Sequence, residues 1–108
     1  TIGAVEIAMM KSTATLINIA RGGIVDDVAL AQALQCGKLF AAGLDVFEGE
    51  PQVHPELLKC KNIVLAPHIA SATEKTRRAM VDLAVDNLRA ALDGKRPPSL
   101  INAEAFKN

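Results

Sequence analysis

The sequence lacks several features that mark common classes of protein. Its 108 residues carry 12 basic and 12 acidic side chains, so no excess of one charge draws the chain to nucleic acid or to an anionic membrane surface. No apolar run approaches the roughly 20 residues that are needed to cross a bilayer, and no stretch resembles a signal peptide. These absences favour a cytoplasmic protein that binds neither nucleic acid nor a membrane.

Cysteine is scarce as well. The two cysteines, Cys36 and Cys60, form no CxxC pair. A chain of this size does not depend on one disulfide, so reduced thiols in a cytoplasm are expected. Hydrophobic residues, in contrast, make up 50% of the sequence, which is enough for one globular domain with a modest core.

Short apolar runs alternate with segments of helical spacing along the chain. Three aliphatic runs predict strands, the first of which reads as buried on both faces; they are TLINIA (15–20), LFAAGLDV (39–46) and NIVLAP (62–67). Asp26 or Asp27 can cap a helix after the first strand. Ser71 and Glu74 fit a capping box that opens a long helix over 72–93.

Strands that alternate with helices imply parallel strands joined by crossover connections. The two connections, roughly 21–39 and 47–61, are longer than the dozen or so residues that a parallel crossover requires. The predicted fold class is therefore α/β, with part of a Rossmann-type doubly wound parallel sheet that ends in a long helix. In such a sheet the carboxyl ends of all strands lie along one edge, where open α/β folds bind ligands.

Four polar residues follow the predicted strands at this edge. Arg21 follows the first strand, Asp45 and Glu50 the second, and His68 the third. An arginine fork pairs with a planar carboxylate through two parallel hydrogen bonds, so Arg21 is a candidate to hold an acid substrate. A carboxylate beside a histidine stabilises the protonated ring, which makes His68 with Glu50 a candidate proton donor. The set fits protonation of the carbonyl oxygen of a bound oxo acid while another group delivers hydride.

Each of these residues also has an interpretation without a function. An arginine after a strand is often a surface charge, a loop glutamate is often a solvated turn residue, and a histidine after a proline is often structural. Asp45 is harder to explain in this way, because a free carboxylate is costly at an apolar strand end. The joint placement of the residues on one edge favours a functional site, since perturbed ionisable groups gather at such sites.

Two other chemistries fit the sequence less well. Asp45, Glu50 and His68 are conceivable metal ligands by type, but Arg21 on the same edge would repel a cation, and no HxH or HExxH spacing is present. We therefore expect no metal site. A cysteine–histidine nucleophile is also disfavoured, because both cysteines end predicted helices just before a strand and so lie at the edge opposite His68.

Three segments carry a family resemblance: MKSTATLINIARGGIVDDVAL, AAGLDVFEGEP and LAPHIASAT. In this order and spacing they resemble consecutive signatures of the D-isomer-specific 2-hydroxyacid dehydrogenases, over nearly the whole chain. The SAT after PHIA is most similar to the branch of glyoxylate, hydroxypyruvate and 2-ketogluconate reductases. The resemblance implies an oxidoreductase that uses NAD or NADP and acts on a short 2-oxo acid. Thr15 and Ala70 depart from the residues that the family prefers, without touching the proton chemistry.

The resemblance also implies roles for individual residues. Arg21 would bind the carboxylate and carbonyl of the substrate, His68 would donate the proton, and Glu50 would pair with His68. Asp45 would hydrogen-bond the carboxamide of the nicotinamide. Two segments would line the nicotinamide end of the cofactor, and they comprise Ile19, Ala20 and Arg21 together with His68, Ile69, Ala70 and Ser71.

The glycine loop that holds the cofactor pyrophosphate in complete family members is absent. The sequence contains ARGG but no GxGxxG between a strand and a helix. We therefore interpret the chain as a C-terminal piece of a reductase, with residues 1–93 in the cofactor-binding domain and residues 94–108 returning to the substrate domain. The isolated chain is expected to be inactive, and the full-length protein is expected to be a homodimer.

Alternatives to the enzyme interpretation stay open. Some proteins of this family act as nucleotide-sensing corepressors and keep the same arginine, glutamate and histidine, so this set does not separate a binding module from an enzyme. A third interpretation gives the fragment a purely structural role. Turnover of glyoxylate or hydroxypyruvate by the full-length protein would distinguish the first two. The residue that selects between NAD and NADP lies outside this sequence.

Overall fold

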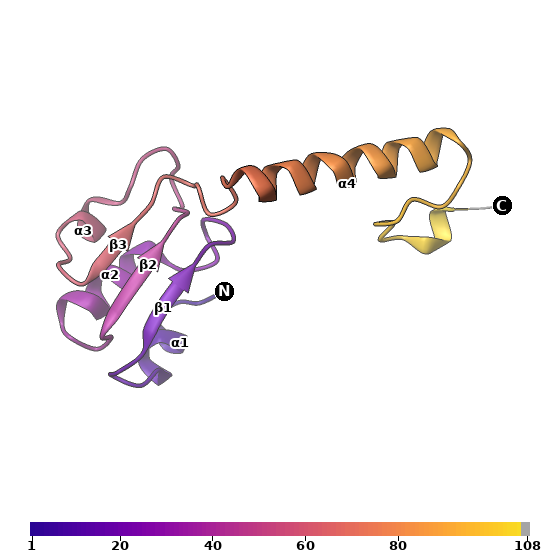
Figure 1. The fold of residues 1–108 in the computed structure, drawn as a ribbon. Helices are drawn as coiled ribbons and strands as arrows, with labels where there is room; N and C mark the ends of the chain where they lie inside the picture. Colours follow the sequence, from indigo (N-terminus) through magenta and orange to yellow (C-terminus); the bar gives the residue numbers. More distant parts are fainter. Residues whose placement is uncertain (107–108) are drawn as a thin grey trace. The chain divides into compact units, whose positions relative to one another are not determined.

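The computed structural model describes residues 1–106, and the chain divides into two compact units, Thr1–Ala70 and a second unit that begins at Ser71 (Figure 1). The first unit contains a sheet and three helices, and the second contains a long helix followed by the short 3-10 helix η1 (Ala103–Ala105). No helix among the described residues combines the length and the apolar composition needed to cross a membrane.

Three parallel strands form the sheet of the first unit, in the order β1-β2-β3 (Figure 1). They are β1 (Thr15–Asn18), β2 (Ala41–Leu44) and β3 (Ile63–Leu65). The register pairs Asn18 with Leu44 and Leu44 with Leu65, so the three strands end level with one another. The predicted parallel α/β arrangement is confirmed. Each strand is shorter than its apolar run, because the ends of the runs bend into the turns that carry the polar residues.

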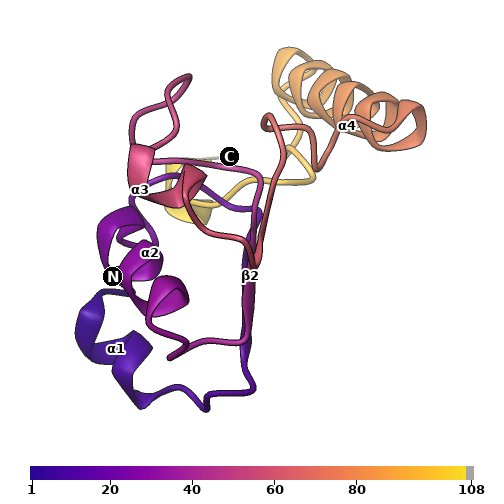
Figure 2. The same ribbon diagram turned by 90° about the vertical axis from the view of Figure 1, so that its left-hand side faces the viewer.

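The helices α1 (Ala4–Met9), α2 (Asp27–Gln35) and α3 (Pro55–Leu58) all lie on one face of the sheet (Figure 2). Side chains alternate between the two faces along a strand. Leu16 of β1 is therefore buried in the core, whereas Ile17 is 63% exposed. The prediction that the first strand is buried on both faces is wrong, because within Thr1–Ala70 no helix covers the second face.

The core of the first unit lies between the sheet and these helices. Its largest fully buried side chains are Ile7, Leu30, Leu39, Val46 and Leu57. Burial of one side chain of this size stabilises a fold by about 1.5–3 kcal/mol. The core therefore holds the strands in place, and with them the polar residues at their carboxyl ends.

Local capping signals set the boundaries of α2. Asp26 is the N-cap residue, since its Oδ1 accepts a hydrogen bond from the backbone N–H of Ala29 at 2.8 Å. Of the two predicted candidates, Asp27 is instead the first helical residue and is buried. Gly37, just beyond the helix, has a φ of 74°, which glycine adopts without the steric cost that a Cβ would bring.

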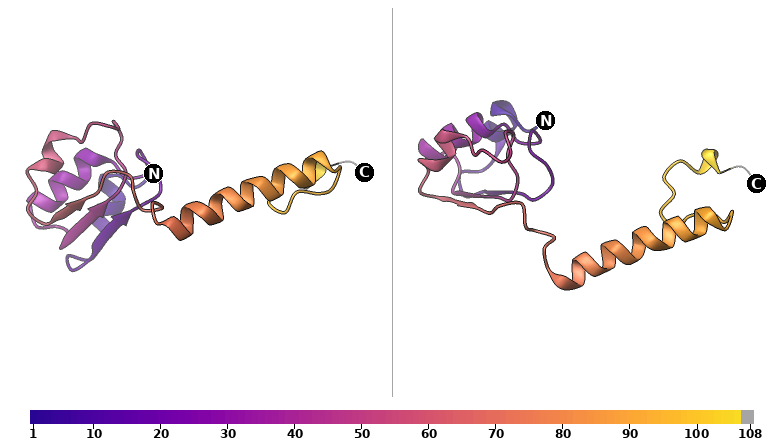
Figure 3. Two further views of the ribbon diagram at one scale, coloured as in Figure 1. Left: turned by 45° about the horizontal axis from the view of Figure 1, so that its top comes forward. Right: turned by 90° about the horizontal axis from the view of Figure 1, so that it is seen from above.

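The second unit contains α4 (Glu74–Leu92), which runs as one uninterrupted helix (Figure 3). Its N-cap is Thr73, whose side chain accepts a hydrogen bond from the backbone N–H of Thr76 at 3.2 Å. The predicted capping box of Ser71 and Glu74 is therefore wrong. Thr73 lies directly before the first helical residue and supplies the hydroxyl acceptor, so Glu74 begins the helix instead of standing at its third position.

Candidate active site

The predicted site residues of the first unit come from the carboxyl ends of the three strands. Arg21 lies in the turn after β1, Asp45 directly follows β2, and His68 follows β3. Glu50 lies in the loop between β2 and α3. Because the parallel strands end level at this edge, Glu50 contacts His68 and Asp45 contacts the segment after His68. The predicted meeting of Glu50 and His68 is therefore present in the structure, with Asp45 beside them.

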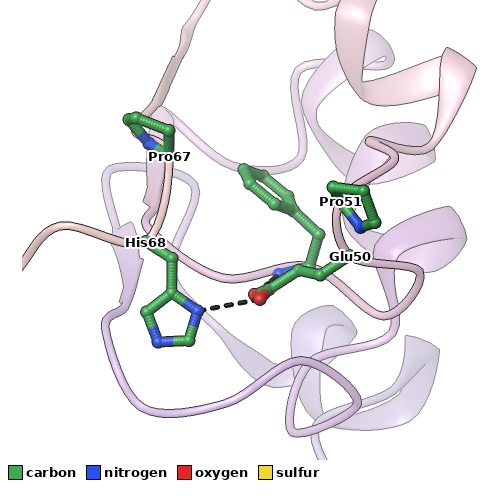
Figure 4. Close-up of a pocket in the computed structure, with 5 residues that line it drawn as sticks. Glu50, Pro51, Pro67 and His68 are labelled. Atoms are coloured by element: carbon green, nitrogen blue, oxygen red, sulfur yellow. Dashed lines mark hydrogen bonds and ion pairs between the residues drawn. The ribbon is translucent and has the colours of Figure 1, made fainter.

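The side chains of Glu50 and His68 are hydrogen-bonded to each other at this edge (Figure 4). Glu50 Oε2 lies 2.8 Å from His68 Nδ1, and Glu50 Oε1 accepts the backbone N–H of Phe47 at 3.0 Å. The hydrogen bond from His68 is the main cause that lowers the pKa of the Glu50 carboxyl, followed by the Phe47 N–H, with a smaller contribution from the charge of Arg21. Glu50 is therefore a carboxylate that engages Nδ1, so Nε2 is the ring nitrogen left for other partners.

The backbone of His68 has an unusual conformation. Its φ is 55°, in the left-handed region that residues other than glycine seldom adopt. The next two N–H groups hold this turn in place, because Ile69 donates to Asp45 Oδ1 and Ala70 donates to Asp45 Oδ2, both at 2.7 Å. Backbone conformations of this kind persist where the surroundings fix them, and they gather at functional sites.

The sequence places the Asp45 carboxylate at an apolar strand end, and the structure shows how it is stabilised there. The residue is only 4% exposed, yet both of its oxygens accept a backbone N–H, so the carboxylate is not left unpartnered in an apolar setting. The N–H of Ile69 is the main cause that lowers the pKa of the Asp45 carboxyl, and the N–H of Ala70 and the nearby His68 lower it further. Asp45 thus stays ionised and holds the segment that carries His68.

Arg21 is exposed in the turn after β1. Its Nη1 donates to the carbonyl oxygen of Ala20 at 2.7 Å. The described residues contain three ion pairs, and Arg21 takes part in none of them. Most of the five N–H donors of the guanidinium therefore have no partner among the described residues.

Two concave surfaces adjoin these groups. The first has a volume of about 320 Å³ and is lined by Phe47, Glu50, Pro51, Pro67 and His68 (Figure 4). The second is almost entirely aliphatic apart from Asp45, and it is lined by Ile17, Ile19, Gly43, Leu44, Asp45, Val64, Ala66, Ile69 and Ala70. The Asp45 carboxylate is nearly buried at this surface, because both of its oxygens accept backbone N–H groups.

The predicted cofactor-binding residues lie in different parts of the structure. Four of them line the second surface, namely Ile19, Asp45, Ile69 and Ala70. Ala20 is exposed beside Arg21 in the turn after β1. Ser71 belongs to the second unit of the chain.

Sequence reasoning missed the residues that fix the loops of the site. Asn18 is buried and holds the turn that carries Arg21. Asp27 is buried as well, and its Oδ2 accepts the backbone N–H of Glu48 at 3.2 Å. An asparagine inside an aliphatic strand and a second aspartate beside a helix cap are the signals that point to them.

A parallel sheet with an imidazole–carboxylate pair at its carboxyl edge is an arrangement that fits part of the dinucleotide-binding domain of a dehydrogenase. The family model described as D-isomer specific 2-hydroxyacid dehydrogenase, NAD binding domain, matches residues 1–70. The chain belongs to this family. The predicted family and Rossmann-type fold are thereby confirmed.

Individual relatives support the predicted branch. Glyoxylate reductases of Thermococcus gammatolerans and Aeropyrum pernix are 51% identical over 106 residues and 53% identical over 108, and each alignment covers 98% of this chain and 32% of the relative. An NADPH-dependent glyoxylate/hydroxypyruvate reductase from Sinorhizobium meliloti, whose crystal structure is in complex with citrate, has 42% sequence identity to this chain. It matches with a TM-score of 0.85 over 99% of this chain and 34% of that one. The chain thus spans about a third of the length of these relatives.

Proposed function

We propose that the protein to which this chain belongs reduces a short 2-oxo acid, such as glyoxylate, hydroxypyruvate or 2-ketogluconate, to the 2-hydroxy acid with NADH or NADPH. The observation that carries the proposal is the 2.8 Å contact between His68 Nδ1 and Glu50 Oε2. It leaves Nε2 available for proton transfer at the same sheet edge as Arg21, which has no carboxylate partner among the described residues.

In the proposed reaction, Arg21 holds the carboxylate of the oxo acid through two parallel hydrogen bonds. The protonated His68 gives the proton on Nε2 to the carbonyl oxygen, while the Glu50 carboxylate balances the charge of the ring and fixes its orientation. When bound, the reduced nicotinamide supplies the hydride that goes to the carbonyl carbon. One hydride and one proton together convert the oxo acid into the hydroxy acid.

Bound molecules in a relative are consistent with a carboxylate site. The structures of the Sinorhizobium meliloti reductase include one in complex with citrate and one in complex with NADP and malonate. Both small molecules carry carboxylates, as a 2-oxo acid does. Arg21 has no carboxylate partner among the described residues, and this supports the same class of ligand here.

We propose that the nicotinamide end of the cofactor lies on the aliphatic surface lined by Ile19, Ile69 and Ala70. Ala20, Arg21, His68 and Ser71 complete the proposed set of contacts. Asp45 is the proposed partner of the carboxamide. Its two oxygens each accept one backbone N–H, and a carboxylate has further lone pairs for an additional donor.

Further proposals concern the whole protein and rest on family membership. We propose a cytoplasmic homodimer, in which residues 1–93 belong to the cofactor-binding domain and residues 94–108 return to the substrate domain. The corepressor alternative receives less support, because the relatives are named as reductases.

Turnover by the full-length protein tests the proposed function. We expect the absorbance of NADH or NADPH to fall when glyoxylate or hydroxypyruvate is added, and we expect His68→Asn to abolish this loss. His54→Asn is the matched control, because His54 caps α3 by accepting the N–H of Glu56 and asparagine can also cap a helix. Tight cofactor binding without turnover of any short oxo acid would favour the corepressor alternative instead.

A further inference from the structure

Asn18 is a buried polar residue at the carboxyl end of β1, and the reaction outlined above makes no use of it. The residue is 6% exposed. Its side-chain oxygen accepts the backbone N–H of Ala20 at 3.1 Å, and its Nδ2 donates to the carbonyl oxygen of Arg21 at 3.0 Å. Its own backbone carbonyl accepts the N–H of Asp45 at 3.0 Å. One side chain therefore ties the peptide groups of the Arg21 turn to the sheet.

The Arg21 turn also packs against the loop that carries Glu50. A Cβ atom on Gly22 would lie 1.9 Å from the carbonyl oxygen of Phe47, so the two backbones are in close contact at this point. The N–H of Phe47 in turn donates to Glu50. The position of the turn is thus coupled to that of the Glu50–His68 pair.

We propose that Asn18 is a positioning residue for Arg21, which fixes the turn from which the guanidinium reaches the carboxylate of the substrate. The inference rests on the proposed function of Arg21. The geometry requires one acceptor and one donor on the same short side chain, and an amide provides both, whereas a carboxylate offers no donor and an aliphatic side chain offers neither. A buried carbonyl or N–H that loses its partner is costly, so the turn would move to find another.

The kinetic test uses the full-length protein with Asn18→Asp and a matched control, Asn62→Asp. Nδ2 of Asn62 donates to the carbonyl oxygen of Phe40 at 3.0 Å, at the amino ends of the strands. We expect Asn18→Asp to lower kcat/KM for the oxo acid by about tenfold or more, mainly through KM for the oxo acid. KM for the cofactor should stay within about twofold, and Asn62→Asp should leave all constants within about twofold.

A double-substitution cycle separates positioning from general damage. If Asn18 acts through Arg21, Asn18→Asp in an Arg21→Lys background should cause little further loss of kcat/KM. Asn18→Ser, which introduces no buried charge, repeats the comparison if Asn18→Asp does not fold. An unchanged kcat/KM in the folded single variant would overturn the positioning role. So would a double variant whose loss of kcat/KM equals the product of the losses of the two single variants.

Hydrogen exchange gives a readout that does not depend on turnover. In Asn18→Leu, whose aliphatic side chain offers neither the acceptor nor the donor, the amide of Ala20 should exchange faster, while the amide of Asp45, which bonds to the backbone of residue 18, should keep its protection. Unchanged exchange at Ala20 would contradict the inference even if the protein has no reductase activity. Absence of turnover in the unsubstituted protein, in contrast, would refute the proposed function and leave the exchange result to decide the role of Asn18.

Discussion

Replacing Gly22 with alanine should damage the site through backbone contact alone. An ideal Cβ at this position lies 1.9 Å from the carbonyl oxygen of Phe47 and 2.4 Å from its carbonyl carbon. Both neighbours are backbone atoms, so no side-chain rotation relieves the overlap. Since real Cβ contacts stay beyond 3.0 Å, the Arg21 turn and the Phe47 loop must separate by about 1 Å.

The size of this shift sets the expected effect of Gly22→Ala. A displacement of about 1 Å in catalytic groups can cost about 100-fold in rate, so kcat/KM for the oxo acid should fall by that order. Overpacking of this kind also destabilises a fold by about 1–3 kcal/mol. Steady-state kinetics of the full-length protein, together with a thermal melt, measure both effects.

Gly49→Ala is the matched control for Gly22→Ala. Gly49 lies in the same loop as Glu50, and a Cβ there would meet its nearest neighbour, the carbonyl oxygen of Gln52, at an ordinary 3.8 Å. Its kinetics and melting temperature should stay close to those of the unsubstituted protein. Equal behaviour of the two alanine variants, with neither losing activity, would refute the reasoning that the Arg21 turn and the Glu50 loop are held by backbone contact.

Four further predictions follow from the same site. In the full-length protein, Arg21→Lys keeps the positive charge but loses the two parallel N–H donors of the guanidinium, so kcat/KM for the oxo acid should fall about 100-fold while cofactor affinity changes little. An unchanged kcat/KM would exclude the carboxylate-binding role of Arg21. Glu50→Gln removes the carboxylate that engages His68 Nδ1, so kcat/KM for the oxo acid should fall about tenfold or more, and an unchanged kcat/KM would exclude Glu50 from proton transfer. The pKa of the Asp45 carboxyl is lowered from its usual 3.8, first by the N–H of Ile69. The hydrogen bonds from Ile69 and Ala70 to Asp45 should therefore stabilise the turn fully above pH 3.8 and be lost as pH falls through the lowered pKa. The amide proton of Ile69 should titrate there in NMR spectra, and persistence of that titration in Asp45→Asn would contradict the assignment. The isolated 108-residue chain lacks the glycine loop, and no helix within Thr1–Ala70 covers the second face of the sheet. It should therefore neither bind NAD(H) or NADP(H) tightly nor reduce glyoxylate, and it should self-associate. Calorimetry, an activity assay and sedimentation that reveal a monomer with tight cofactor binding would contradict this prediction.

Features that depend on neighbouring residues could be predicted from the sequence. The parallel arrangement of the strands follows from the alternation of apolar runs and helical segments, and the cap of α2 follows from one of two adjacent aspartates, of which Asp26 takes the role. The meeting of Glu50 and His68 also follows, because parallel strands end at one edge and both residues come shortly after a strand.

Features that depend on the approach of distant segments could not be predicted in this way. The overlap that forbids a side chain at Gly22 involves the backbone of Phe47, and nothing in the sequence around Gly22 specifies this neighbour. The identity of the uncovered face of the sheet also could not be predicted, because an apolar run does not indicate which of its faces the helices cover. Ile17 is as aliphatic as Leu16, yet only Leu16 is buried.

The carboxylates of the site serve chiefly as acceptors that hold loops in place. Asp45 accepts two backbone N–H groups, and Glu50 accepts one together with the Nδ1 of His68. These contacts lower the pKa of each carboxyl, most strongly through the Ile69 N–H for Asp45 and through His68 for Glu50, so both remain charged at neutral pH. The hydrogen-bond donors left for the proposed substrate are therefore the guanidinium of Arg21 and the Nε2 of His68, while Asp45 keeps lone pairs for the proposed carboxamide contact. A site in which the anions are already bound by the fold while the donors stay free is suited to an anionic substrate that gains a proton.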